Sequence, residues 1–279
     1  MTRPFLIALF FASLIAPAHA EIAKRIVSIN LCADQLVLLL AKREHVLSVS
    51  DLARDPGLSN VAEAARGIAV NYGDAEDILR YRPDVVVSGR FRQNATNRLL
   101  RRLGIRVVTI ESPHSLPDVR KIIRTLAAEL GVPERGRAVI ADLDRRIAAA
   151  PLPPGPQTRK LRVANYQLRL GSYGRGSLGN DILERAGVIN IAAELGIASF
   201  GFLPLETMIV ANPDVLIMSD TQQPGASLAD AILDHPVFRR LARTKKIIRV
   251  PAKYWMCAGP WVGEALRLVR RGVYGAPRP

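Results

Sequence analysis

The chain contains a repeated sequence motif that limits the folds it can adopt. Residues 76–88 read EDILRYRPDVVVS, and residues 206–219 read ETMIVANPDVLIMS. In each copy a glutamate, Glu76 or Glu206, stands seven residues before a proline, and the two glutamates lie 130 positions apart, as do the two prolines. A proline ends a helix, and a short run of branched apolar residues is typical of a buried parallel strand. The repeat therefore predicts a helix, a turn and a buried strand, once in each of two similar lobes.

Similar apolar runs recur along the rest of the chain. They alternate with helix-like stretches, which indicates an α/β fold with parallel sheets. The runs are residues 26–29, 46–50, 84–88, 106–110, 162–167, 214–219 and 246–250.

The two halves are joined by a helical segment. A helical pattern begins at residue 116, is interrupted by Gly131 and Pro133, and resumes as far as residue 150. Residues 151–156, PLPPGP, cannot continue a helix and favour an extended chain. We therefore expect an N-terminal α/β lobe at 21–115, a connecting helix with a proline-rich boundary at 116–156, and a C-terminal α/β lobe at 157–279.

The first twenty residues have the features of a secretory signal peptide. Arg3 precedes an apolar run, and small residues surround a cleavage point at Ala18-His19-Ala20. The run is about twelve residues long, fewer than the roughly twenty that span a bilayer. We expect residues 1–20 to be removed and the remaining chain to lie in the periplasm.

The chain is strongly basic, with a formal net charge of +14. Such a charge favours anionic ligands, anionic lipid surfaces or an acidic partner. The arginines are scattered rather than clustered, and an exported protein rarely meets nucleic acid, so we expect no nucleic-acid partner.

Together these segments resemble the periplasmic substrate-binding proteins of ABC importers for vitamin B12 and ferric siderophores. The resemblance covers essentially the whole exported chain. It is carried by the order and spacing of RIVSINLCADQLVLLL, PDVVVSG, RRLGIRVVTIESPHSLPDV, DILERAGVINIAAELG and PDVLIMSD.

This resemblance implies the class III periplasmic binding protein fold, in which two Rossmann-like lobes with parallel sheets are joined by a single long α-helix. It also implies a ligand-binding cleft between lobes that hardly move. We expect a monomer that is not an enzyme, has no cofactor or metal site of its own, and captures a ferric siderophore, cobalamin or related metal chelate for an ABC importer. In the family, one exposed glutamate per lobe meets arginines on the importer's membrane subunits, and Glu76 and Glu206 match those positions. A plain helix-start role, in which a carboxylate complements the helix dipole, is compatible with docking.

Ligands of parallel α/β sheets bind beyond the carboxyl ends of the strands. This rule selects the residues that follow the predicted strands. Tyr72 is a further candidate because it lies just before the first repeat. Trp255 offers the flattest apolar surface for a macrocycle, and Arg90 can hold an anionic group by paired hydrogen bonds. The candidate ligand-binding residues are Cys32, Tyr72, Arg90, Phe91, Tyr173, Trp255 and Cys257.

Cys32 and Cys257 are the chain's two cysteines, and each follows a predicted strand in a different lobe. Three interpretations stay open: a disulfide that closes a long loop and pins the lobes together, two free thiols that face the ligand, or incidental burial. The second corresponds to an alternative function, a thiol-dependent extracytoplasmic metal-transfer or redox protein on the same fold.

One motif points to another class of protein. Residues 174–179 match the G-x-G-x-x-G pattern of dinucleotide-binding turns. No acidic residue follows about twenty residues later at the end of a second strand, and an exported protein has little access to nicotinamide cofactors, so we expect a loop that allows close backbone approach. The three histidines beyond residue 20 are spread over different segments without a triad or zinc spacing.

Overall fold

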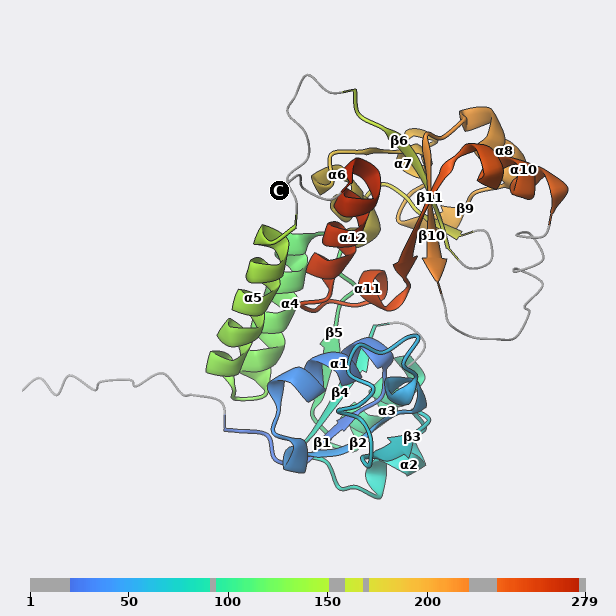
Figure 1. The fold of residues 1–279 in the computed structure, drawn as a ribbon. Coiled ribbons are helices and arrows are strands. Elements are labelled where there is room, and N and C mark those ends of the chain that lie inside the picture. The colour runs from blue at the N-terminus through green and yellow to red at the C-terminus, as the bar shows by residue number, and fades with distance from the viewer. Residues whose placement is uncertain (1–20, 91–93, 151–158, 168–170, 221–234, 276–279) are drawn as a thin grey trace, which may run out of the picture.

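The computed structural model describes residues 21–90, 94–150, 159–167, 171–220 and 235–275, which form two α/β lobes. In Figure 1 the N-terminal lobe lies at the bottom and the C-terminal lobe at the top, with helices α4 and α5 along one side. The predicted signal peptide, the proline-rich boundary and Phe91 lie outside the described residues. No helix among the described residues is long and apolar enough to cross a membrane.

The N-terminal lobe is built on a five-stranded sheet in the order β3-β2-β1-β4-β5, and all its neighbouring strands are parallel. Four of these strands were predicted from their apolar runs. The fifth, β3, has three residues without such a run, so it was not predicted. The elements are β1 (Ile26–Ser28), α1 (Leu31–Leu40), η1 (Arg43–His45), β2 (Val46–Ser50), η2 (Asp51–Arg54), β3 (Ala69–Asn71), α2 (Ala75–Leu79), β4 (Val85–Gly89), α3 (Asn94–Arg102) and β5 (Val107–Ile110).

The C-terminal lobe contains a four-stranded parallel sheet in the order β11-β10-β6-β8 and a two-stranded antiparallel ribbon of β7 and β9. Its elements are β6 (Arg162–Tyr166), β7 (Gly171–Tyr173), α6 (Leu178–Arg185), β8 (Ile189–Asn190), α7 (Ile191–Glu194), β9 (Phe200–Phe202), α8 (Leu205–Ala211), β10 (Val215–Asp220), α10 (Pro236–Thr244), β11 (Lys246–Pro251), α11 (Lys253–Met256) and α12 (Val262–Tyr274).

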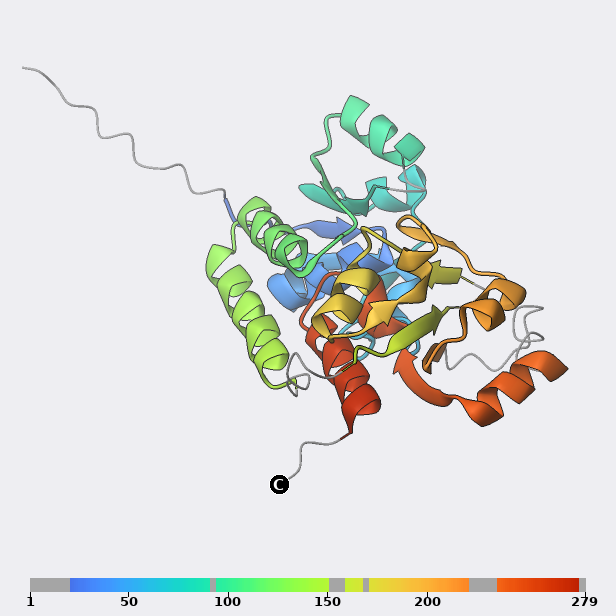
Figure 2. The ribbon, with the colours of Figure 1, turned by 90° about the horizontal axis from the view of Figure 1, so that it is seen from above.

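Two neighbouring helices, α4 (Leu116–Glu129) and α5 (Pro133–Ala148), connect the lobes, and Figures 1 and 2 both show them side by side. The chain turns between them at Gly131, whose φ of 71° suits glycine. At 1.5 Å per residue α5 is about 24 Å long. It begins at the N-terminal lobe, where Arg135 Nε donates to the Leu39 carbonyl at 3.0 Å. It ends against α12, where a Cβ on Gly263 would lie 2.6 Å from the Cβ of Arg146. Of the two helices, α5 carries the chain from the N-terminal lobe to the C-terminal lobe, and α4 packs along it.

The repeated phrase folds alike in both lobes, as α2 followed by β4 and as α8 followed by β10. The aspartate after each proline has a structural role that the sequence did not reveal. The Asp84 carboxylate accepts the backbone N–H of Arg25 at 3.0 Å, just before β1, and the Asp214 carboxylate accepts the backbone N–H of Arg162 at 2.8 Å, at the start of β6. Each arginine side chain in turn donates to a carbonyl at or just after the end of the repeat's helix, Arg82 O at 2.8 Å and Ala211 O at 2.6 Å. Each aspartate thus fastens its strand to the neighbouring strand of the sheet.

Candidate functional site

The carboxyl edges of the two sheets meet where a disulfide joins the lobes. Cys32 lies in the first turn of α1, directly after β1, and Cys257 follows α11. The two residues form a disulfide with their Cα atoms 5.1 Å apart, and the described residues contain no free cysteine. In this state neither cysteine offers a thiol to a ligand or a metal.

A second tie between the lobes lies beside the disulfide. Asn60 Nδ2 donates to the carbonyl of Lys253 at 2.7 Å and to Gln35 Oε1 at 2.9 Å. The ammonium of Lys253 donates to the carbonyl of Pro56 at 3.0 Å. The loop after η2 is therefore bound to α11 in the opposite lobe.

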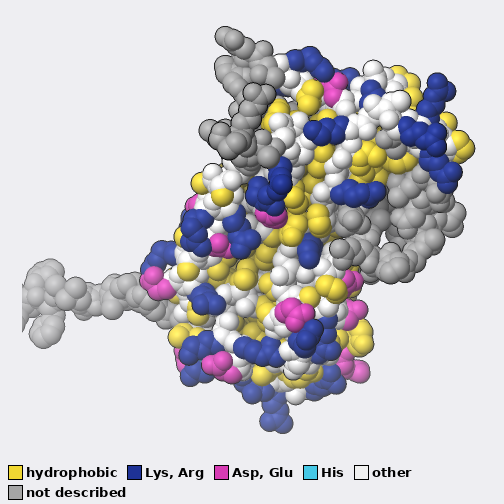
Figure 3. Space-filling model, viewed as in Figure 1, with side chains coloured by type: hydrophobic (Ala, Val, Ile, Leu, Met, Phe, Trp, Pro, Cys, Tyr) yellow, Lys and Arg dark blue, Asp and Glu magenta, His cyan; other side chains and the backbone are white. Residues whose placement is uncertain are grey.

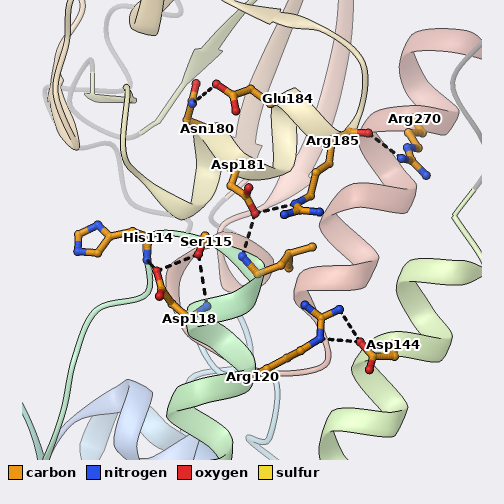
Figure 4. A network of polar contacts seen from close by, with 11 residues as sticks. His114, Ser115, Asp118, Arg120, Asp144, Asn180, Asp181, Glu184, Arg185 and Arg270 are labelled. Atoms are coloured by element: carbon orange, nitrogen blue, oxygen red, sulfur yellow. Dashed lines mark hydrogen bonds and ion pairs between the residues drawn. The ribbon is translucent and has the colours of Figure 1, made fainter.

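A third tie fastens the start of α4 to the C-terminal lobe, as Figure 4 shows. The Asp181 carboxylate on α6 accepts the backbone N–H of Leu116 at 2.8 Å and pairs with Arg185 at 2.8 Å. His114 Nδ1 donates to the carbonyl of Gly176 at 2.8 Å. The disulfide and these hydrogen bonds join the two lobes at three places.

Three aromatic rings, those of Trp255, Tyr173 and Phe200, are in contact in series from this junction toward the solvent, and we call them the aromatic ladder. The Trp255 ring is stacked on Tyr173, with centroids 6.0 Å apart, and Tyr173 meets the edge of Phe200 at 5.3 Å. Trp255 is 1% exposed whereas Phe200 is 55% exposed, and burial raises the pKa of Tyr173 to about 12. The expectation that Trp255 itself presents a flat surface to the ligand needs correction, because Tyr173 and the strand ends cover it. Its role here is to support the ladder from below.

Two further aromatic rings, which the sequence analysis did not select, are exposed in β9. Phe200 is 55% exposed and Phe202 is 59% exposed. Their spacing of two places both rings on one side of the strand. Gly201 between them is required, since a Cβ there would lie 2.7 Å from Ile197 Cγ2. The pattern Phe-Gly-Phe was the available signal, but three residues are too few to predict a strand.

Tyr72 faces solvent on the N-terminal lobe. It directly follows β3, at the carboxyl edge of the sheet, and is 74% exposed. An exposed ring of this size at the carboxyl edge of a sheet is a candidate contact for a ligand. The N-terminal lobe thus contributes Tyr72, and the C-terminal lobe Phe200 and Phe202.

Arg90 directly follows β4, but its charge is already matched. Its guanidinium pairs with the Glu111 carboxylate at 2.7 Å, and this hydrogen bond raises the pKa of Arg90. A ligand anion would have to displace Glu111 or share Arg90 with it. Phe91, the next candidate, lies outside the described residues.

Two hollows of about 330 Å³ each have none of the exposed rings of Tyr72, Phe200 and Phe202 in their lining. One lies between β5 and α4, and its lining includes the candidate residue Arg90 with its partner Glu111, together with Lys121 and Leu126. The other is lined by Leu39, Arg146 and Trp261 among others, from both lobes and α5. We assign the candidate site to the strand edges with exposed aromatic rings instead, because aromatic surface suits a flat ligand better than either hollow.

The glycine motif at 174–179 serves local packing. A Cβ on Gly174 would lie 2.0 Å from the carbonyl oxygen of Ile197, and one on Gly179 would lie 2.5 Å from the ring of Tyr173. Gly176 has a φ of 77°, which favours glycine. Close packing against the aromatic ladder and the segment before β9 accounts for the motif.

Asp34 is a fully buried carboxyl group on α1 next to the junction. Burial raises its pKa to about 6, although hydrogen bonds from Ser50 oppose the shift. The folded state therefore holds this proton more tightly than the unfolded state, where the pKa is about 3.9. Ionisation of Asp34 penalises folding as the pH rises from about 4 through 6.

Replacing Asp34 with asparagine should remove this penalty. Two pKa units correspond to about 3 kcal/mol, so Asp34→Asn should gain up to that much unfolding free energy over wild type between pH 4.5 and 7.5. Urea denaturation at a series of pH values measures the difference. A constant difference between the two proteins across this range would show that Asp34 does not titrate there.

Comparison with known proteins agrees with this architecture. A family profile described as periplasmic binding protein matches residues 26–254. The structure of the periplasmic heme-binding protein RhuT from Roseiflexus sp. RS-1 is similar, with a TM-score of 0.74 and 28% identity over 90% of this chain and 99% of that one. Among curated proteins no sequence match was found.

Two structures from Vibrio cholerae share the fold at lower identity. The periplasmic heme-binding protein HutB has a TM-score of 0.71 at 20% identity, covering 90% of this chain and 98% of its own. The vitamin B12 binding protein BtuF has a TM-score of 0.64 at 17% identity, covering 90% and 96%.

Proposed function

Since the chain belongs to the periplasmic binding protein family, we propose that it captures a flat metal chelate, with heme as the leading candidate, and delivers it to an ABC importer. Proteins of this family bind solutes, and the chain is a binding protein rather than an enzyme. The observation that carries the proposal is the set of exposed aromatic rings at the strand edges, Tyr72 on one lobe and Phe200 and Phe202 on the other. Flat apolar rings suit a macrocycle, and ties between the lobes reduce the ordering cost of binding.

Heme is favoured over the other chelates by two observations. RhuT, a heme-binding protein, is 28% identical over nearly the whole of both chains. In addition, Tyr72 presents a phenol at 74% exposure, and a tyrosine oxygen is a known axial ligand of heme iron. In this proposal Tyr72 contacts the iron while Phe200 and Phe202 pack against the porphyrin.

Titration with hemin tests this proposal. Wild-type protein should bind hemin with a shifted Soret band, and Tyr72→Phe should lose about tenfold or more in affinity together with the tyrosinate band, because the ring stays but the oxygen is gone. Tyr81→Phe is a matched control, since the Tyr81 hydroxyl contacts Arg80 beyond the other end of α2. Binding of cyanocobalamin but not hemin would reassign the ligand to a corrinoid, and an unchanged spectrum for Tyr72→Phe would remove Tyr72 from the site.

Glu76 and Glu206 are proposed to dock the protein on the two membrane subunits of the importer. Both lie exposed in the first turn of their helices, and neither carboxylate forms a hydrogen bond or ion pair with another described residue. Each helix runs back toward the start of the following strand, so each carboxylate lies near the carboxyl edge of its lobe. Figure 3 shows basic side chains dispersed over both lobes, a background against which two matched carboxylates can set orientation.

We further propose that residues 1–20 direct export, so that the protein works in the periplasm as a monomer and meets no nucleic acid. The thiol-dependent alternative has no support in a structure whose cysteines are bonded to each other.

A further inference from the structure

Two polar side-chain atoms that share one face of the C-terminal sheet, at its carboxyl edge, have no hydrogen-bond partner. Gln167 directly follows β6 and is 8% exposed, and its Nε2 has no hydrogen-bond partner. Ser219 lies near the end of β10, and its buried Oγ is likewise unpartnered. Buried polar groups are nearly always hydrogen-bonded, so two such atoms on adjacent strands require an explanation.

The strand register places these two side chains next to each other. Val215 of β10 pairs with Val163 of β6, and Met218 pairs with Tyr166, so the next step sets Ser219 beside Gln167. Adjacent strands lie about 5 Å apart, and side chains alternate between faces. Gln167 and Ser219 therefore project from the face that carries Val163 and Val215, which belong to the largest buried apolar cluster.

This face leads to the aromatic ladder. On the other side of Ser219 the register sets Val250 of β11, whose carbonyl accepts the indole N–H of Trp255 at 3.4 Å. Trp255 supports Tyr173 and Phe200 as described above. The two unpartnered atoms thus lie at the inner end of the candidate site.

The chemistry of the two atoms defines what they can bind. The amide Nε2 of Gln167 can only donate, and the hydroxyl of Ser219 can also donate. They are not bonded to each other, since both atoms lack a partner. The partner of Gln167 Nε2 must be an acceptor, and a carboxylate offers two acceptor oxygens, one for each of the two groups.

We infer that Gln167 and Ser219 hold a carboxylate at the rim of the transported chelate. The inference rests on the proposed function and deepens it: the cargo bears an acidic side chain, and the C-terminal lobe recognises that side chain while the aromatic rings hold the macrocycle. A polar pair of this kind gives the site selectivity for acidic macrocycles over fully apolar ones of the same shape.

A pair of ferric porphyrins separates this role from general binding. Hemin carries two carboxylates, whereas ferric etioporphyrin has none. Wild-type protein should bind hemin about tenfold to a hundredfold more tightly than ferric etioporphyrin. Gln167→Glu should abolish this preference, because a carboxylate would then face the carboxylate of hemin, while its affinity for ferric etioporphyrin should equal that of wild type. Ser219→Ala should reduce the preference severalfold.

Asn97→Asp is the matched control, since Asn97 is a buried amide with an unpartnered oxygen in the opposite lobe. It should leave the ratio of the two affinities unchanged. An unchanged ratio in Gln167→Glu, or equal binding of both porphyrins by wild type, would overturn the inference and leave the proposed function standing. If wild-type protein binds neither porphyrin, the assignment of heme fails and this inference fails with it.

Discussion

Replacing both Cys32 and Cys257 with serine is expected to lower the free energy of unfolding by about 5 kcal/mol. The disulfide closes a loop with a sequence separation of 225, and the chain-entropy account gives that value for so long a loop. Urea denaturation of the oxidised wild type, the reduced wild type and the double variant measures it. Reduced wild type should match the double variant, since both lack only the cross-link.

The same double variant also separates the two functions considered for this fold. Two other ties between the lobes remain, from Asn60 to Lys253 and from Leu116 to Asp181. We therefore expect the hemin affinity of the folded variant to fall by less than about tenfold. Complete loss of ligand binding with the stability intact would contradict the structural role of the disulfide and favour thiol chemistry.

The sequence predicted those helices and strands whose pattern lies within one short segment of the chain. The duplicated phrase placed β4 and β10 correctly because proline and a buried apolar run report on the chain's immediate neighbours. By contrast, β3, β7 and β9 have three residues each, and they form through pairing with strands that are distant in the sequence. Strands formed in this way have no periodic pattern of apolar residues in their own sequence.

The candidate site was only partly predictable for a related reason. The rule that ligands bind beyond strand ends placed Arg90 at the carboxyl edge, where it lies, whereas Tyr72 was proposed only from its position before the first repeat, because β3 was not predicted. The rule could not predict how exposed each side chain would be. Trp255, which is buried in the fold, was therefore preferred to Phe200, which is exposed. Likewise, the ion pair that neutralises Arg90 comes from Glu111, on a separate loop. Exposure and pairing are decided by tertiary contacts, which one sequence does not display.

Reversing both docking glutamates, Glu76→Lys with Glu206→Lys, should abolish uptake while leaving hemin affinity within about twofold of wild type. Each lobe would then present a cation to an arginine, and like charges facing each other across an interface are strongly unfavourable. Each single variant should be intermediate, because the remaining carboxylate still holds one lobe. Growth on hemin as the iron source, in cells that supply the cognate importer, gives the readout.

A charge-matched control separates this effect from a general change in electrostatics. Glu63→Lys with Glu44→Lys alters the net charge by the same amount, and both residues are exposed in the N-terminal lobe, with Glu44 at the opposite edge of the sheet in η1. The control should support normal uptake. Normal uptake by the docking variant would refute the assignment, whereas equal impairment of both variants would mean that the importer senses net charge and not two fixed points. The disulfide and the hydrogen bond from Leu116 to Asp181 cross between the lobes, and in the proposed docking they would keep Glu76 and Glu206 at one spacing, so that two weak surface charges could set one orientation.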